Sequence, residues 1–147
     1  MGRTYRRGGI GRRPAHDRGV NKILVVDDDP MIVAIYKRAF LKAGFEVDAA
    51  ADGREGLDRF HAWKPDVVLL DMNLPGVSGC DFLKLIRHEP GARAKVPIVV
   101  LTGGNNRSNV MSAFGAGANS VMVKQRDQPQ QVVDVIKTML SGDVRWG

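Results

Sequence analysis

The chain of 147 residues has one cysteine, Cys80, and no long apolar stretch. A lone cysteine cannot form an internal disulfide, so we expect a reducing, cytoplasmic setting. A membrane-spanning helix needs about 18–20 apolar residues, and no secretory signal is visible, which predicts no membrane insertion. The three histidines, His16, His61 and His88, lack the spacing of metal ligands. These absences exclude a disulfide scaffold, a transmembrane protein and a zinc site built on cysteine and histidine.

The composition is ordinary for a globular protein, with 44% hydrophobic and 26% charged residues, but the net charge of +6 is unevenly placed. Residues 1–20 hold six arginines and one aspartate, so the rest of the chain is nearly neutral. We expect a basic, disordered N-terminal extension at 1–20, one folded domain at 21–141, and a C-terminal tail at 142–147. Contact of the arginine-rich extension with nucleic acid or anionic lipid is the less favoured alternative.

Short apolar runs alternate with stretches of helical spacing along residues 21–141. The predicted strands are about 22–27, 45–50, 66–70, 97–101 and 119–123. The predicted helices are about 30–43, 52–62, 79–88, 106–115 and 128–140. Short apolar runs between helices are typical of buried parallel strands. The pattern predicts an α/β fold, a doubly wound five-stranded parallel sheet sandwiched by five helices.

The helices at 30–43 and 106–115 differ in how clearly the sequence marks their buried faces. The first has an apolar face of Ile32, Ile35, Tyr36, Ala39 and Phe40. The second has only a partial stripe of Val110, Met111 and Phe114. We expect both sets to face the sheet.

Polar groups follow four of the predicted strands: Asp27-Asp28-Asp29, Asp71, Thr102 and Lys124. Taken singly, each also fits a turn, a helix cap or a solvated charge. Ligand sites of open parallel sheets lie beyond the carboxyl ends of the strands, so the fold predicts that these groups share one rim. Asp29 is better placed as the N-cap of the next helix, with Pro30 at its first position.

The chemistry of this rim suits a metal ion and a phosphoryl group. Crowded carboxylates repel one another unless some are protonated or a cation lies among them. Oxygen ligands without histidine or cysteine favour a hard ion, Mg²⁺ or alternatively Mn²⁺. A carboxylate can act as nucleophile and form an aspartyl phosphate, whose developing charge an ammonium and a hydroxyl would stabilise.

Four segments of the chain carry a family resemblance over about residues 21–141. They are ILVVDD at 23–28, PDVVLLDMNLPG at 65–76 followed by Gly79, PIVVLTG at 97–103, and Gly117-Ala118 with Lys124. Together, in this order and spacing, they resemble the receiver domain of two-component response regulators. The resemblance implies the flavodoxin-like fold of the chemotaxis regulators.

The resemblance also assigns roles to the rim residues. It makes Asp71 the phosphoacceptor, supplied by a histidine kinase or a histidine phosphotransfer protein. Mg²⁺ would be held directly by Asp28 and Asp71, through water by Asp27, and by the backbone carbonyl of Asn73. Thr102 and Lys124 would contact the phosphoryl group. Such a protein is no conventional enzyme, although it promotes its own phosphorylation and dephosphorylation.

Two residues depart from the family pattern. Gln125 stands where the family usually has a proline after the lysine, often joined by a cis bond, and a cis bond without proline is costly. Val121 stands where the family often has a tyrosine or phenylalanine that turns toward the threonine. We therefore expect the chemistry to be intact and the signalling surface to work differently.

Three functions remain open from the sequence. We favour a stand-alone receiver that signals to an unknown downstream protein by protein–protein contact, since no further domain is visible. A second reading is a pseudo-receiver that binds partners without phosphorylation. A third is an aspartyl-phosphate phosphohydrolase, but that class carries Asp-x-Asp on its first strand, whereas here Asp71 is on the third and is followed at the second position by Asn73.

Overall fold

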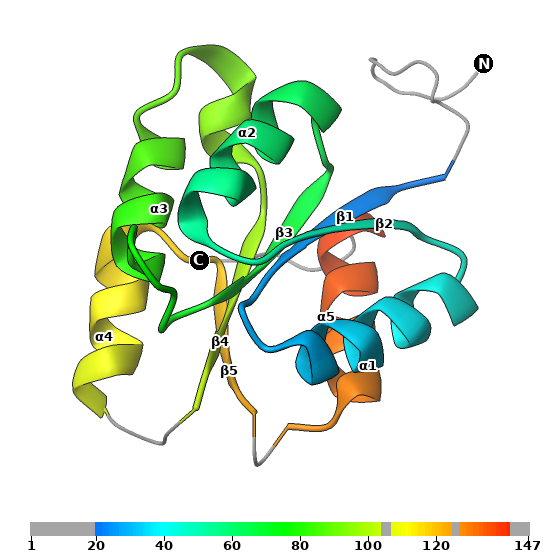
Figure 1. Ribbon diagram of the computed structural model, residues 1–147. Helices are drawn as coiled ribbons and strands as arrows, with labels where there is room; N and C mark the ends of the chain where they lie inside the picture. The colour runs from blue at the N-terminus through cyan, green and yellow to red at the C-terminus, as the bar shows by residue number, and fades with distance from the viewer. Residues whose placement is uncertain (1–19, 104–106, 125–126, 142–147) are drawn as a thin grey trace.

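Five parallel strands form one sheet in the order β2-β1-β3-β4-β5 (Figure 1). The computed structural model describes residues 20–103, 107–124 and 127–141. The strands are β1 (Lys22–Val26), β2 (Glu46–Ala50), β3 (Val67–Asp71), β4 (Ile98–Thr102) and β5 (Ser120–Val123). The predicted doubly wound parallel sheet is confirmed.

Helices cover both faces of the sheet, with α1 and α5 on one face and α2, α3 and α4 on the other (Figure 1). Their bounds are α1 (Pro30–Lys42), α2 (Gly53–Trp63), α3 (Gly79–Arg87), α4 (Arg107–Ala116) and α5 (Pro129–Ser141). A short 3-10 helix, η1 (Gly91–Lys95), was not predicted. No described helix is long and apolar enough to cross a membrane.

The central strands β1, β3 and β4 are apolar apart from their end residues because both faces of the sheet are covered there, whereas the edge strand β2 includes Glu46 and Asp48. Along β1, Leu24 and Val26 pack toward α2, α3 and α4, whereas Ile23 and Val25 pack toward α1 and α5. All five residues of β3 and of β4 are buried. The burial holds the carboxyl ends of the central strands, and the polar groups that follow them, in one place.

Two of the predicted apolar faces are partly wrong. In α4, Met111 and Phe114 are 65% and 49% exposed, and the small residues Ala113 and Ala116 face the core instead. In α1, Ile35 is 42% exposed although Tyr36 and Phe40 are buried as predicted. The small alanines therefore form the buried face of α4. The spacing of apolar residues along the sequence did not predict which face is buried.

Aspartates cap the N-terminal ends of α1 and α2. Asp29 accepts a hydrogen bond from the Met31 amide and caps α1, as expected. Asp52 accepts from the Glu55 amide at the start of α2, and Glu55 reaches back to the amide of Ala51 rather than to that of Asp52. Because Asp29 caps α1, its carboxylate is engaged by the helix and is not one of the three grouped acids.

Arg87 ties three parts of the chain together beneath α3. Its guanidinium donates hydrogen bonds to the carbonyls of Ala94, Val96 and Gly117 and to the side-chain oxygen of Asn119. Burial lowers the pKa of Arg87. Nothing in the local sequence pattern indicated this contact.

Three expectations concern parts of the chain outside the described residues. They are disorder of the extension at 1–20, of which only Val20 is described, the tail at 142–147, and the bond between Lys124 and Gln125.

Candidate functional site

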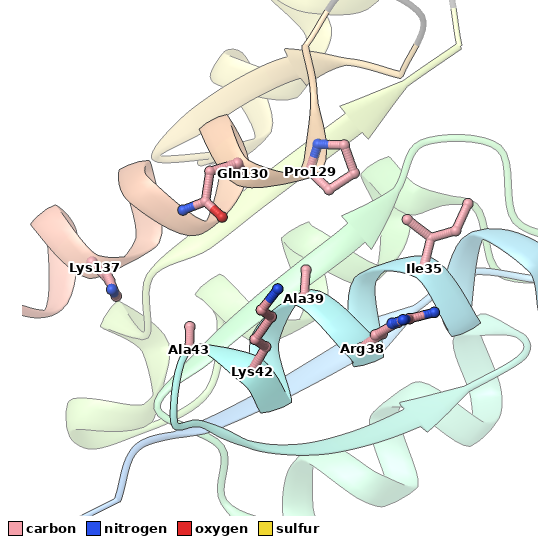
Figure 2. A pocket seen from close by; sticks show the side chains of 8 residues that line it. All are labelled: Ile35, Arg38, Ala39, Lys42, Ala43, Pro129, Gln130 and Lys137. Carbon is pink, nitrogen blue, oxygen red and sulfur yellow. The ribbon is translucent and has the colours of Figure 1, made fainter.

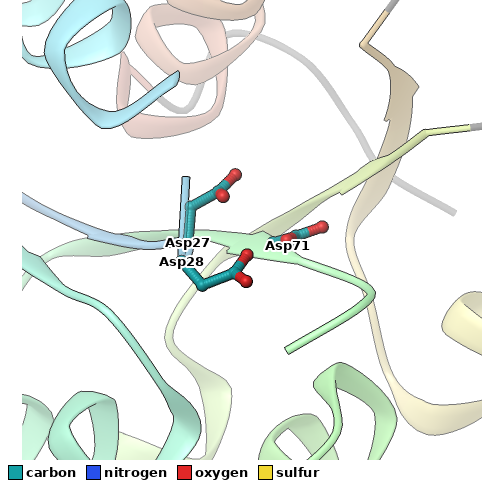
Figure 3. Close-up of side chains that lie close together, drawn as sticks. All are labelled: Asp27, Asp28 and Asp71. Atoms are coloured by element: carbon teal, nitrogen blue, oxygen red, sulfur yellow. The ribbon is translucent and has the colours of Figure 1, made fainter. Parts of the chain in front are cut away.

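Three aspartates meet at the carboxyl ends of β1 and β3 (Figure 3). One carboxylate oxygen from each of Asp27, Asp28 and Asp71 lies within 4.8 Å of the others. Strands β1 and β3 are neighbours, and the order of the strands along the sheet reverses between them. Open parallel sheets bind ligands at such a point. Asp27 and Asp71 are 2% and 3% exposed, whereas Asp28 is open to solvent.

Lys124 comes to the same place from the end of β5. Its Nζ lies 3.2 Å from Oδ2 of Asp27 and 3.3 Å from Oδ1 of Asp71. Its backbone amide donates to the carbonyl of Thr102, at 2.9 Å. Thr102 is the last residue of β4 and is 1% exposed. The structure thus brings Asp27, Asp28, Asp71, Lys124 and Thr102 to one rim.

The carboxylates carry more negative charge than Lys124 offsets. Burial raises the pKa of Asp71, the charge of Asp27 raises it further, and the Asn73 amide and Lys124 only partly oppose this. Burial lowers the pKa of Lys124, but Asp71 and Asp27 raise it by more, so it stays above its ordinary value. A further cation at this rim would therefore be attracted.

The donor atoms fit a hard divalent cation. Oδ2 of Asp27 is buried and accepts no hydrogen bond from the described residues, although the Lys124 ammonium is nearby. The other oxygen of Asp27 accepts from the amide of Asp29, at 2.9 Å. Among the described residues, this is the group of acids whose oxygens are close enough to share an ion, and oxygen-only ligands suit Mg²⁺.

The loop after β3 holds Asp71 and starts α3 directly against it. The Asn73 amide donates to Oδ1 of Asp71, at 3.2 Å, and the Asn73 side chain is exposed. Gly79, the first residue of α3, lies so close that a Cβ there would be 2.6 Å from the carbonyl oxygen of Asp71. Gly79 belongs to the motif that carried the resemblance, but its contact with Asp71 is seen only in the structure.

Tyr36 lies in α1 beneath the rim, and sequence reasoning assigned it only to the core. Its pKa is raised to about 12 by burial, by the charge of Asp127 and by that of Asp27. Burial first, and then the neighbouring negative charge, therefore keep the phenol neutral.

The phenolate absorbance of Tyr36 is expected to appear only near pH 12, and Tyr36→Phe should remove that component. An unfolded tyrosine ionises near pH 10, so the free energy of unfolding should fall between about pH 10 and 12, by about 2–3 kcal/mol. Denaturant titrations of parent and Tyr36→Phe at pH 9 and pH 11.5 measure this. An equal fall in both proteins would show that Tyr36 contributes nothing.

Two grooves flank α1. One of about 540 Å³ lies beside the acids and is lined by Asp27, Asp28, Val33, Ala34 and Ala49, among others. The other, of about 430 Å³, lies between α1 and α5 and is lined by Arg38, Lys42 and Lys137 but by none of the three acids (Figure 2). The first groove opens beside Asp27 and Asp28, and the second is separate from the rim.

Comparison with known proteins identifies the family. Residues 23–137 match the family model described as the response regulator receiver domain. Over 119 residues the chain is 33% identical to the DNA-binding response regulator MtrA of Mycolicibacterium smegmatis, covering 81% of this chain and 50% of that protein. Over 117 residues it is 32% identical to the chemotaxis protein CheY of Thermotoga maritima, covering 78% of this chain and 93% of CheY. The chain thus spans about half the length of the MtrA relatives it matches.

Solved structures agree with this match. A putative response regulator from Chloroflexus aurantiacus superposes with a TM-score of 0.79 at 32% identity, covering 84% of this chain and 99% of that one. The chemotaxis response regulator CheY4 of Vibrio cholerae superposes with a TM-score of 0.74 at 30% identity, covering 81% and 98%. The chain belongs to the response regulator receiver domain family.

Proposed function

We propose that the protein accepts a phosphoryl group on Asp71 and signals by protein–protein contact. The donor is a histidine kinase or a histidine phosphotransfer protein, in the cytoplasm. One observation carries the proposal: a buried Asp71 carboxylate lies 3.3 Å from the Lys124 ammonium and beside two further acids. A purely structural ion pair would need neither the crowding of three carboxylates nor a groove beside them.

The acids and the adjoining loop are the proposed site of Mg²⁺, with Mn²⁺ as the alternative. Asp28 and Asp71 would supply carboxylate oxygens directly, Asp27 would act through water, and Asn73 would supply its backbone carbonyl. When bound, the ion adds positive charge that offsets the carboxylates and the oxygens of the incoming phosphoryl group.

Asp71, Lys124 and Thr102 have separate roles in the proposed phosphoryl transfer. An ionised oxygen of Asp71 attacks phosphorus while the bond from phosphorus to the donor histidine nitrogen breaks, and the electron pair stays on that nitrogen. The ammonium of Lys124 partly opposes the rise in the pKa of Asp71 and so favours its ionised form; it then neutralises an oxygen of the transferred group. The hydroxyl of Thr102, at the end of the adjacent strand, donates to another phosphoryl oxygen. Attack of water on phosphorus then breaks the bond between phosphorus and the Asp71 oxygen, which releases inorganic phosphate and restores the carboxylate.

The proposed partners are a phosphodonor that reaches the rim and a downstream protein. The groove beside Asp27 and Asp28 lies next to the acids, although Asp71 itself does not line it. Signalling then passes to a downstream protein. MtrA is a DNA-binding response regulator, and this chain matches only half of its length.

Incubation with Mg²⁺ and acetyl phosphate is expected to add one phosphoryl mass to the parent protein, as measured by intact mass spectrometry. Asp71→Asn should show no increment because the nucleophilic oxygen is lost. Asp58→Asn, which changes an exposed acid on α2 by the same atoms, is the matched control and should behave as the parent. An increment that persists in Asp71→Asn contradicts the assignment, and none in the parent favours the pseudo-receiver.

A further inference from the structure

The loop that carries Lys124 out of β5 is closed by two reciprocal hydrogen bonds. The amide of Val123 donates to Oδ2 of Asp127 at 2.8 Å, and the amide of Asp127 donates to the carbonyl of Val123 at 2.8 Å. Lys124 is the first residue inside this ring. Neither bond belongs to the sheet or to α5.

The Val123 amide needs this carboxylate because of its place in the sheet. Strand β5 is an edge strand, paired with β4 alone. The amide of Lys124 points to β4, where it reaches the carbonyl of Thr102. Successive amides along a strand point to opposite sides, so the Val123 amide points away from β4. Asp127 satisfies it, and the return bond from the Asp127 amide keeps residue 127 beside the end of the strand.

The ammonium of Lys124 is paired with Asp27 and Asp71, so its position depends on how the backbone of Lys124 is held. The next residue, Gln125, has no ring to fix its backbone φ as proline would. The lysine stem is flexible, yet its ammonium lies within 3.3 Å of both Asp27 and Asp71. The backbone of Lys124 is therefore held from two directions, by Thr102 on β4 and by the ring that Asp127 closes.

We propose that Asp127 is a positioning residue for phosphoryl transfer: its bond to the Val123 amide sets the direction in which the chain leaves β5 and so aims the Lys124 ammonium at Asp71. This inference rests on the proposed function. Asp127 acts through Lys124 and does not touch the phosphoryl group.

Asp127→Ala should lower the rate of phosphorylation by acetyl phosphate ~10- to 100-fold, the scale of a misplaced catalytic group. Asp127→Asn should keep most of the rate, because its amide oxygen still accepts from Val123. Mg²⁺ affinity, measured by calorimetry without phosphodonor, should stay close to that of the parent in Asp127→Asn. In Asp127→Ala it should not weaken, because the acids stay in place and the competing ammonium is aimed away from them. Asp134→Ala removes an exposed acid from α5 and controls for the change in charge.

A double variant separates positioning from general stability. In a Lys124→Ala background, Asp127→Ala should cause no further loss of rate, because the group it aims is gone. Rates are compared below the melting transition of every variant. If Asp127→Ala melts too low, Asp127→Glu replaces it, since the longer side chain keeps the charge but displaces the oxygens, and the same loss is expected.

The possible results separate a failure of the role inferred for Asp127 from a failure of the proposed phosphoacceptor function. A parent that is never phosphorylated overturns both. A phosphorylated parent with an equally fast Asp127→Ala overturns the inference alone. A full additional loss in the double variant, or a loss in Asp127→Asn as large as in Asp127→Ala, also overturns it, because either result means that Asp127 acts through its charge or through stability and not by aiming Lys124.

Discussion

Lys124→Ala is expected to lower the rate of phosphorylation of Asp71 about 100- to 1,000-fold, the usual effect of removing one group that stabilises developing charge. The ammonium lies 3.2–3.3 Å from the carboxylates of Asp27 and Asp71. Its loss takes away the positive charge that meets the phosphoryl oxygens and allows the pKa of Asp71 to rise further. The measurement is the time course of the phosphoryl mass increment with acetyl phosphate and Mg²⁺.

The same substitution should tighten Mg²⁺ binding. Lys124 is a positive charge that competes with a metal ion for the same carboxylates, so the affinity measured by calorimetry is expected to rise severalfold. A slower transfer with tighter metal binding cannot come from simple unfolding. Lys137→Ala on α5, a lysine outside the site (Figure 2), is the matched control and should change neither quantity. Unchanged transfer in Lys124→Ala would remove this lysine from the mechanism.

Gly79→Ala is expected to destabilise the fold by about 1–3 kcal/mol or more and to slow phosphorylation strongly. The added methyl would lie 2.6 Å from the carbonyl oxygen of Asp71 and 2.8 Å from Cα of Met72. Both atoms are backbone and cannot turn aside as a flexible side chain would. To relieve the contact, the start of α3 or the end of β3 has to move, and Asp71 moves with it. Denaturant unfolding and the acetyl phosphate assay measure the two effects.

Gly115→Ala provides the control within the same chain. Gly115 is inside α4, and a Cβ there would meet nothing within 4 Å. Because alanine is the better helix former, this substitution should stabilise the protein by about 0.5–1 kcal/mol and leave phosphorylation unchanged. A Gly79→Ala protein as stable as the parent would show that the loop yields easily and that the close approach has no consequence.

Local pattern was enough to predict the order of strands and helices. Buried parallel strands show as short apolar runs, and both β3 and β4 are buried along their whole length. Cap residues such as Asp29 act on neighbours a few positions away, so their effect can also be predicted from the sequence. The rule that parallel sheets bind ligands at their carboxyl ends then predicted that Asp27, Asp71 and Lys124 meet.

Contacts between distant segments were decided by the tertiary structure alone. The buried face of α4 is set by the space its neighbours leave, which is why Ala113 rather than Met111 lies in the core. Arg87 reaches carbonyl groups up to 30 residues away. The raised pKa of Tyr36 and the hydrogen-bonded ring closed by Asp127 depend on which segments of the chain pack beside these residues.

The sequence by itself thus determined the fold class, the order of the elements and the chemical groups at the rim, because these depend on periodicity and on the short reach of caps and strand ends. Only the tertiary structure decided how the rim is held. The aim of Lys124, the close approach of Gly79 to Asp71 and the neutral phenol of Tyr36 arise from packing and charge between segments far apart in the chain. Such contacts have no local signature, since each partner is an ordinary residue until the fold sets it beside the other.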